Sequence, residues 1–205
     1  MTPLILHEDP VSGNCYKIRL VAARLGLALE RRTYDIMQGE TRTAAFIANV
    51  DAGGRIPVLQ IGQRFLPESN AACVYLAHGS ALVPAERFDH ADMMRWLFWE
   101  QYSHEPNVAT LRFWRRYVGE ANLSTAQASL VPGKEQAGAA ALALMEGHLN
   151  TRDWFVAGRP TLADLILYPY THVAAEAGFD LGEYPAVTAW LARVAALPGH
   201  IGMDD

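Results

Sequence analysis

Hydrophobic positions in the first part of the chain alternate between strand-like runs and helix-like spacing. Residues 4–7 form a short hydrophobic run, and hydrophobic residues over 18–25 then recur at helical spacing. A second strand is expected over residues 29–35, and a short helix around residues 46–50. This succession of strand, helix, strand and helix is typical of an α/β unit.

The next segment predicts a hairpin followed by a helix. Residues 56–61 and 64–66 are strand-like runs separated by Gly62-Gln63, a spacing typical of two antiparallel strands joined by a tight turn. A helix is expected over residues 69–76, where Gly79 provides a stop signal.

Beyond Phe88, helical spacing dominates and strand-like runs disappear. A long helix carrying Met93 and Trp99 is expected, with Pro106 breaking or kinking it ahead of a second helix over 108–118. The polar stretch 119–134 contains Pro132-Gly133, and we expect a loop there. Three further helices are expected over residues 137–149, 162–177 and 186–197.

The pattern therefore predicts two domains. An α/β domain is expected over residues 1–82 and an all-helical domain over residues 88–205, with the junction near 83–87. A chain of 205 residues is long enough to form a hydrophobic core without disulfide or metal support.

Charge and cysteine content exclude several classes of protein. The net charge of −5 gives no basic face for nucleic acid, so no such partner is expected. The N-terminal hydrophobic run is too short for a signal peptide, and no run of about 18 hydrophobic residues could span a membrane. We expect a soluble, cytoplasmic protein. Two cysteines, Cys15 and Cys73, and scattered histidines predict neither a disulfide framework nor a metal site.

Pro57 stands at the start of an internal strand, where it cannot donate a backbone hydrogen bond. A cis peptide bond would explain it, because that geometry exposes the backbone of Ile56 to an extended ligand. On these residues alone, a proline at the first position of a strand with no ligand role is an equally simple interpretation.

Glu68 and Ser69 precede a hydrophobic helix. Ser69 is a natural N-cap, and the positive end of the helix dipole attracts a carboxylate. Glu68 beside it could bind an ammonium group, so the pair suits the end of an α-amino acid, which carries both charges. An ordinary capped helix with a solvated glutamate is the alternative.

Ser12, Gly13 and Asn14 lie at the turn between the first strand and the first helix. A hydroxyl, an amide and free N–H groups at a helix N-terminus favour a bound anion, and they lower the pKa of a thiol bound there. Simple capping of the helix by Ser12 or Asn14 is again the alternative.

Together these segments resemble the glutathione transferase superfamily nearly from end to end. Its three glutathione-site segments are matched by residues 12–19, 54–59 and 67–71. Thr161-Leu162-Ala163-Asp164 is similar to the family's buried S/T-x-x-D capping box, and residues 184–191 are similar to bacterial members. The resemblance implies a thioredoxin-like N-terminal domain followed by an all-helical domain.

The resemblance also implies how glutathione is bound. Pro57 matches the family's cis-proline, and Ile56 matches the residue whose main chain pairs with the cysteinyl part of glutathione. Glu68 and Ser69 match the pair that binds the γ-glutamyl end. Arg55 lies where many members carry a basic residue near the glycine end.

The catalytic roles implied by the resemblance fall on Ser12 and Asn14. Ser12 matches the serine-type members, such as the zeta class, and Asn14 matches the asparagine of the bacterial nu class. Both would stabilise the glutathione thiolate for attack on a small hydrophobic electrophile; a pKa lowered by two units corresponds to about 2.7 kcal/mol. The electrophile pocket is expected on the helices that carry Trp99, Tyr102, Arg112 and Trp114.

The same resemblance implies glutathione as co-substrate with no other cofactor, a homodimer, a role in detoxification and no membrane partner. Two alternatives stay open. Ser12 replaces the leading cysteine of a C-x-x-C motif, so an internal dithiol cycle is excluded, but a disulfide reductase or peroxidase using glutathione is not. The other alternative is a non-catalytic glutathione-binding or assembly module. Cys15 and Cys73 are interpreted as packed thiols.

Overall fold

The computed structural model describes residues 2–205, which divide into two compact units. The first unit contains the residues up to Ala81 together with Leu197–Asp205, and the second is Leu82–Ala196. The sequence placed the whole of residues 88–205 in the helical domain, and for Leu197–Asp205 this was wrong. Tyr16 and Arg19 of the first unit donate hydrogen bonds to the backbone of that segment, a long-range contact that no local pattern encodes.

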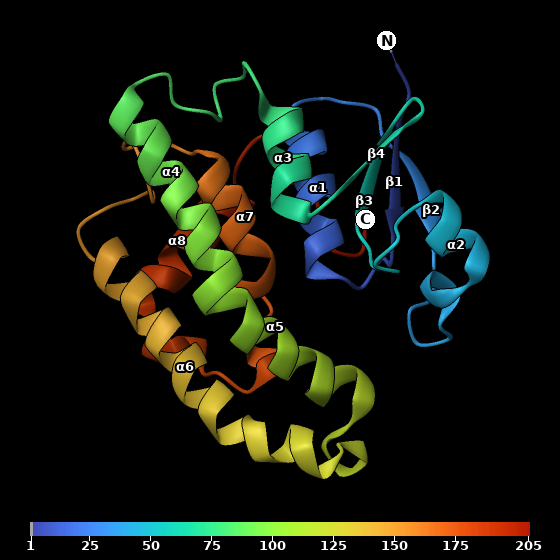
Figure 1. The fold of residues 1–205 in the computed structure, drawn as a ribbon. Helices are drawn as coiled ribbons and strands as arrows, with labels where there is room; N and C mark the ends of the chain where they lie inside the picture. Colours follow the sequence, from blue (N-terminus) through green and yellow to red (C-terminus); the bar gives the residue numbers. More distant parts are fainter. Residues whose placement is uncertain (1) are drawn as a thin grey trace. The chain divides into compact units, whose positions relative to one another are not determined.

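A four-stranded mixed sheet with the order β2-β1-β3-β4 forms the centre of the first unit (Figure 1). Strand β1 (Leu4–Glu8) pairs in parallel with β2 (Glu30–Thr33) and antiparallel with β3 (Val58–Ile61). Strand β3 pairs antiparallel with β4 (Arg64–Pro67) through the tight turn that the sequence predicted.

Three helices cover this sheet. Helices α1 (Gly13–Arg24) and α3 (Ser69–Ala77) lie side by side on one face, and α2 (Ala44–Asn49) lies on the other side of the sheet (Figure 1). A 3₁₀ turn at Glu40–Arg42 precedes α2. The order β-α-β-α-β-β-α and the mixed sheet are those of a thioredoxin-like domain, so the predicted fold class is confirmed.

The second unit is all helical, as predicted. Its helices are α4 (Arg87–Trp99), α5 (Glu105–Phe113), α6 (Thr125–Leu149), α7 (Leu162–Thr171) and α8 (Pro185–Ala195), with 3₁₀ turns at Glu120–Asn122, Ala174–Ala177 and Leu181–Glu183. Helix α7 is buried along its whole length, and α4, α5 and α8 pack against it.

The predicted break at Pro106 takes the form of a π-helical segment between two α-helices. Five residues of π-helix, Glu100–His104, follow α4, and α5 begins directly afterwards with Pro106 in its first turn. A proline is tolerated there because its missing N–H would have no partner in the first turn of a helix. A second π-helical segment, Trp114–Val118, follows α5.

The expected loop over residues 119–134 is wrong for most of its length. Helix α6 starts at Thr125 and continues through Pro132, because Ser124 and Gln127 form a capping box ahead of the proline. Lys134 Nζ donates to the Pro106 carbonyl at 2.5 Å, which fixes the helix beyond the proline. Capping and tertiary contacts therefore offset the one backbone hydrogen bond that Pro132 removes.

Helix α7 ends at Thr171, earlier than the predicted end at residue 177. The Thr171 hydroxyl donates to the Leu167 carbonyl at 2.7 Å, and the chain then turns through the 3₁₀ segment Ala174–Ala177. Within residues 2–205, no helix combines the length and hydrophobicity needed to cross a membrane.

Candidate active site

Strand pairing brings three of the predicted segments to one end of the sheet. Val58 at the start of β3 is paired with His7 near the end of β1 and with Pro67 at the end of β4. The turn after β1, the residues before β3 and the residues after β4 therefore emerge at the same place. These segments carry every residue that the sequence assigned to glutathione: Ser12, Asn14, Arg55, Ile56, Pro57, Glu68 and Ser69.

The turn after β1 is fixed by three hydrogen bonds to Asp9. The Ser12 N–H donates to the Asp9 carbonyl at 3.0 Å, and the Asp9 carboxylate accepts from the Val11 N–H at 3.2 Å and the Ile36 N–H at 3.4 Å. Asp9 itself is buried. The Ser12 side chain is therefore held at a defined position at the start of α1.

Ser12 is the N-cap of α1. Its Oγ accepts the Cys15 N–H at 3.4 Å, and its side chain also hydrogen bonds to the Cys15 thiol. The first turn of α1 contains no acidic residue, so no carboxylate of that turn neutralises the positive end of the helix dipole. The half-buried Ser12 hydroxyl thus lies in an electropositive setting that suits an anion.

Two side-chain hydrogen bonds join the starts of α1 and α3. Ser69 Oγ donates to Asn14 Oδ1 at 3.1 Å, and Lys17 Nζ donates to Asn70 Oδ1 at 3.3 Å. Ser69 and Lys17 are buried, whereas Asn14 and Asn70 are half-buried. The N-termini of two helices therefore face one small region, with a buried ammonium group beside it.

Glu68 has an unusual backbone conformation, with φ 71° and ψ 111°. Residues other than glycine rarely adopt positive φ, and such residues cluster at binding sites. The conformation turns the chain from β4 into α3, and it leaves the Glu68 side chain exposed beside the buried Ser69. The predicted N-cap at Ser69 is therefore wrong: Glu68 is the N-cap residue, and the Ser69 hydroxyl donates to Asn14 instead of capping the helix.

The Ile56-Pro57 peptide bond is cis, as the family resemblance implied. Pro57 is buried and Ile56 is half-buried, one residue outside the paired part of β3. Within residues 2–205, Ile56 has no backbone hydrogen bond to another residue, so its main chain can pair with an extended ligand. The neighbouring Arg55 is exposed, and its N–H donates to Asp51 Oδ2 at 3.0 Å.

The residues predicted for the electrophile pocket are only partly brought together. Trp99 and Tyr102 line a groove of about 360 Å³ in the second unit, opposite small residues of α6. Arg112 and Trp114 do not line this groove. Arg112 is buried and pairs with Glu176 at 2.7 Å. Trp114 is also buried. Helical spacing in the sequence could not distinguish side chains that line the groove from side chains buried elsewhere in the unit.

Within residues 2–205, Cys15 and Cys73 form no disulfide, and both are buried. Burial raises the pKa of the Cys15 thiol to about 12, so it stays protonated near neutral pH. Cys15 is therefore a packed thiol, as the sequence predicted, and it is unsuited to nucleophilic chemistry.

Sequence reasoning placed Lys17, Arg19 and Asn70 inside the matched segments 12–19 and 67–71 but gave them no role. A lysine or arginine on a helix is normally solvated. Helical spacing was a further signal, because Lys17 lies one turn beyond Asn14 and therefore on the same side of α1.

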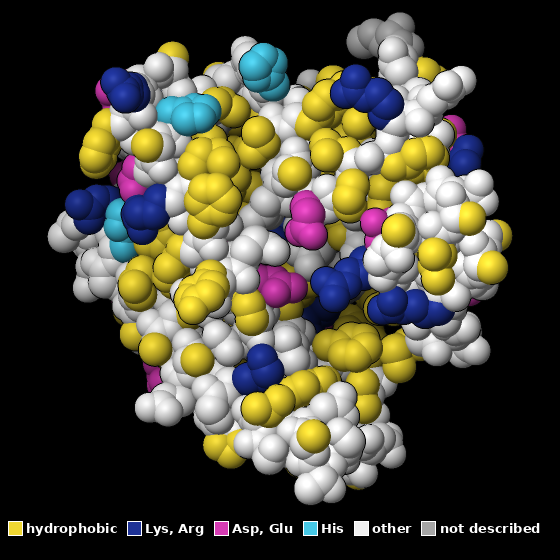
Figure 2. All heavy atoms as spheres, viewed as in Figure 1, with side chains coloured by type: hydrophobic (Ala, Val, Ile, Leu, Met, Phe, Trp, Pro, Cys, Tyr) yellow, Lys and Arg dark blue, Asp and Glu magenta, His cyan; other side chains and the backbone are white. Residues whose placement is uncertain are grey.

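The surface carries no dominant charge on the face seen in Figure 2. Basic and acidic side chains are interspersed there with hydrophobic ones, and neither sign covers that face.

Comparison with known proteins agrees with this architecture of a thioredoxin-like unit and a helical unit. The family models of the glutathione S-transferase N-terminal and C-terminal domains match residues 3–78 and 93–198. A structure from Rhodopseudomonas palustris, described as a possible glutathione S-transferase, is 42% identical with a TM-score of 0.93 and covers 98% of each chain. A glutathione S-transferase structure from Pseudomonas fluorescens Pf-5 is 41% identical, with a TM-score of 0.91 over 98% of this chain and 99% of that one.

Glutathione S-transferase D7 of Anopheles gambiae is 30% identical over 205 residues, covering 98% of this chain and 89% of that protein. The chain therefore belongs to the glutathione S-transferase family. The family predicted from the sequence is confirmed.

Proposed function

We propose that this chain is a glutathione transferase that activates the thiol of glutathione for attack on a small hydrophobic electrophile. The observation that carries the proposal is the meeting of Ser12, Ile56-Pro57 and Glu68-Ser69 at one end of the sheet. Membership of the glutathione S-transferase family supports it.

Each part of glutathione has a chemical counterpart in the proposed site. The α-carboxylate of the γ-glutamyl end binds at the N-terminus of α3, where Ser69 supplies a hydroxyl, and the exposed Glu68 binds the ammonium group. The cysteinyl backbone pairs with the unpaired main chain of Ile56. The exposed Arg55 attracts the glycine carboxylate.

We assign the thiolate-stabilising role to Ser12 and Asn14, a site of the serine and asparagine type. The thiol proton passes to solvent, and the Ser12 hydroxyl and Asn14 amide stabilise the resulting thiolate beside the positive end of α1. The sulfur then forms a bond to the electrophilic carbon, and the leaving group departs with its electron pair.

Several parts of the proposal extend beyond the first unit. We assign the electrophile to the groove that Trp99 and Tyr102 line, without Arg112 and Trp114, which are buried outside it. Glutathione is the only co-substrate, with no further cofactor. A homodimer in the cytoplasm completes the proposal.

The test is a spectrophotometric titration of glutathione bound to the wild type and to Ser12→Ala and Asn14→Ala. Each variant should raise the pKa of the bound thiol by about one unit, a tenfold change in the thiol–thiolate equilibrium. Ser129→Ala is the matched control, because Ser129 is an exposed serine of α6 in the other unit. If neither active-site variant shifts the titration, the assignment of Ser12 and Asn14 is wrong.

A substrate panel distinguishes the remaining functions. Conjugation of aryl halides or epoxides supports the transferase, whereas reduction of peroxides or disulfides without conjugation would replace it with a glutathione-dependent reductase. Retention on immobilised glutathione with no turnover of any class would indicate a non-catalytic binding module.

A further inference from the structure

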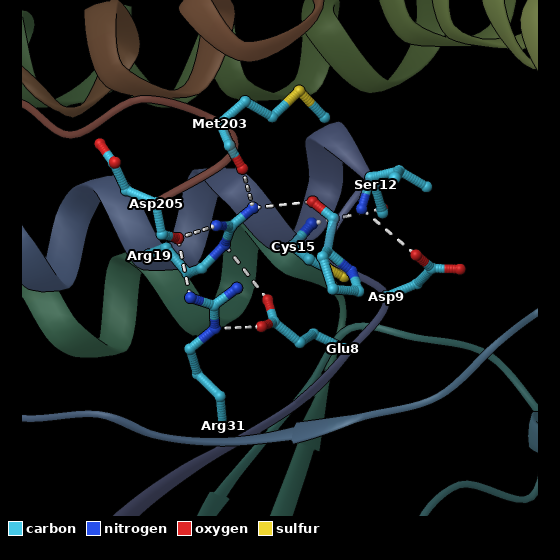
Figure 3. A network of polar contacts seen from close by, with 10 residues as sticks. Glu8, Asp9, Ser12, Cys15, Arg19, Arg31, Met203 and Asp205 are labelled. Atoms are coloured by element: carbon cyan, nitrogen blue, oxygen red, sulfur yellow. Dashed lines mark hydrogen bonds and ion pairs between the residues drawn. The ribbon is translucent and has the colours of Figure 1, made fainter.

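A buried guanidinium connects the active-site turn to the C-terminal segment Leu197–Asp205. Arg19 is 3% exposed and lies on α1 seven residues beyond Ser12, on the same side of the helix. Its Nη2 donates to the Pro10 carbonyl at 2.9 Å and to the Met203 carbonyl at 2.8 Å, and its Nη1 donates to the Asp205 carbonyl at 2.7 Å (Figure 3).

The charge of Arg19 is fixed in place by Glu8, the last residue of β1. Glu8 is fully buried, and its carboxylate contacts Arg19 Nε at 3.2 Å and also pairs with Arg31 (Figure 3). Arg31 Nη1 donates in turn to the Asp205 carbonyl at 2.7 Å. Because breaking a buried ion pair leaves an uncompensated charge, Arg19 has little freedom to move away.

The C-terminal segment is bound through its main chain. Besides the bonds from Arg19 and Arg31, Tyr16 Oη donates to the Ile201 carbonyl at 2.5 Å, and Arg24 Nη1 donates to the Pro198 carbonyl at 3.0 Å. All these acceptors are backbone oxygens, so the contact depends on the presence and path of the segment more than on its side chains.

We propose that Arg19 is a positioning residue for the thiolate site and that the docked segment Leu197–Asp205 holds it in its working orientation. This inference rests on the proposed function. Pro10 lies inside the turn of residues 9–12 that sets the position of the Ser12 hydroxyl, and Arg19 binds the Pro10 carbonyl with the same nitrogen that binds Met203.

Two consequences follow if Arg19 Nη2 couples the active-site turn to the C-terminal segment. Without the C-terminal segment, Arg19 loses two acceptors, the carbonyls of Met203 and Asp205. Its guanidinium group is then no longer held in the orientation that binds the Pro10 carbonyl. The coupling is also reciprocal: if docking of the segment improves the glutathione site, bound glutathione must stabilise docking by the same factor.

The first experiment removes residues 201–205 and titrates the thiol of bound glutathione, with Arg24→Ala in the full chain as the matched control. Arg24 binds the same segment at Pro198 but does not touch the active-site turn. The truncation should raise the pKa of the bound thiol by about one unit, and kcat/KM below that pKa should fall about tenfold. Arg24→Ala should leave both unchanged.

The second experiment uses chains of full length, so it stands even if the truncated chain does not fold. Hydrogen exchange of Leu197–Asp205 should slow when glutathione binds the wild type at a pH where its bound thiol is ionised, and this protection should be absent in Arg19→Lys. Lysine keeps the positive charge opposite Glu8 but lacks the planar fork that reaches Pro10 and Met203 together.

The outcomes separate this inference from the proposed function. If the wild type binds glutathione and lowers the pKa of its thiol, but a folded truncation keeps that pKa and ligand binding leaves exchange in the segment unchanged, the positioning role is wrong. If the wild type does not bind glutathione, the proposed function itself fails, whatever the segment does.

Discussion

Helices α1 and α7 begin with the same kind of cap and use it in opposite ways. At the start of α7, Asp164 Oδ2 accepts from the Thr161 N–H at 2.8 Å and from the Thr161 hydroxyl at 3.1 Å. Its Oδ1 accepts from the Phe155 N–H at 3.2 Å and from Trp190 Nε1 at 3.0 Å. Thr161 and Asp164 are fully buried, so this helix start is closed.

The start of α1 is open. Ser12 Oγ accepts one backbone N–H, that of Cys15, over a long 3.4 Å, and the first turn has no acidic residue to complete a capping box. Ser12 and Asn14 are both half-buried.

This difference explains why one cap stabilises the fold and the other suits a ligand. Every helix start leaves N–H groups without partners inside the helix. Where a carboxylate of the chain itself accepts them, as Asp164 does, they contribute to stability. Where the chain supplies no such acceptor, as at Ser12, the same groups can bind an anion from outside.

The strongest way to break the comparison is Asp164→Ala. It should lower the free energy of unfolding by about 3 kcal/mol or more, because several buried donors lose their acceptor at once. Urea denaturation measures this effect, and Asp164→Asn, which keeps one carbonyl oxygen, should lose less. A loss below about 1 kcal/mol in the alanine variant would show that the cap of α7 is not a major source of stability.

Alanine at the two cap hydroxyls gives a matched pair. Thr161→Ala should cost about 2 kcal/mol of stability and Ser12→Ala less than about 1 kcal/mol, since only the first side chain is fully buried and bonded to a buried carboxylate. Both values come from the same denaturation series. Equal losses would contradict the distinction between a closed and an open cap.

Ser69→Ala tests whether the open helix starts bind glutathione. It removes the hydroxyl bonded to Asn14, so KM for glutathione should rise about tenfold, the equivalent of one hydrogen bond of about 1.4 kcal/mol. Steady-state kinetics with varied glutathione measures this. Thr43→Ala, at the cap of α2 in the same unit, is the control and should leave KM unchanged.

Acid should lower the stability of the fold beside the closed cap, because His148 is partly buried there. Burial lowers the pKa of His148, whose Nε2 lies 3.0 Å from the carbonyl of Phe155, a residue bonded to Asp164. The unfolded chain therefore takes up the proton first. This stability is present above about pH 6.5 and is lost as the pH falls through the folded pKa.

Denaturation across that range should show a flatter pH dependence in His148→Gln than in the wild type. His90→Gln, at an exposed histidine, is the control for changes that do not involve burial. Identical slopes in the wild type and His148→Gln would exclude this contribution.

The smallest effect is expected from Cys15→Ala. Since burial raises the pKa of this thiol to about 12, the variant should keep kcat/KM within about twofold of the wild type. The folded wild type should also resist iodoacetamide at neutral pH. Loss of activity in Cys15→Ala with the fold intact would place this thiol in the chemistry.

Sequence patterns predicted most of the elements because their signals are local. The turn at Gly62-Gln63 and the capping box at Thr161 and Asp164 each depend on residues that are close together in the chain. Helix α6 was missed at its start because Pro132 dominates the local signal, while Lys134 reaches the distant Pro106.

The proposed glutathione site was predictable to a similar extent. Ser12, Pro57 and Ser69 stand at element boundaries that a sequence can locate, and the family resemblance added their roles. The support beneath them was not predictable. Lys17 and Arg19 read as ordinary surface residues of a helix, and only folding shows that both are buried.

By itself, the sequence determined the family, through its matching segments, and the order of most elements, because turn and helix-boundary signals depend on near neighbours in the chain. Only the tertiary structure decided that Glu8 and Arg19 are buried together and that the C-terminal segment belongs to the first unit. Arg19 and Asp205 are 186 positions apart in the chain, and no periodic pattern spans that separation. A buried guanidinium needs acceptors for its N–H groups, and Arg19 finds them in Glu8 and in backbone carbonyls that include those of Met203 and Asp205. These contacts bind the C-terminal segment to the first unit.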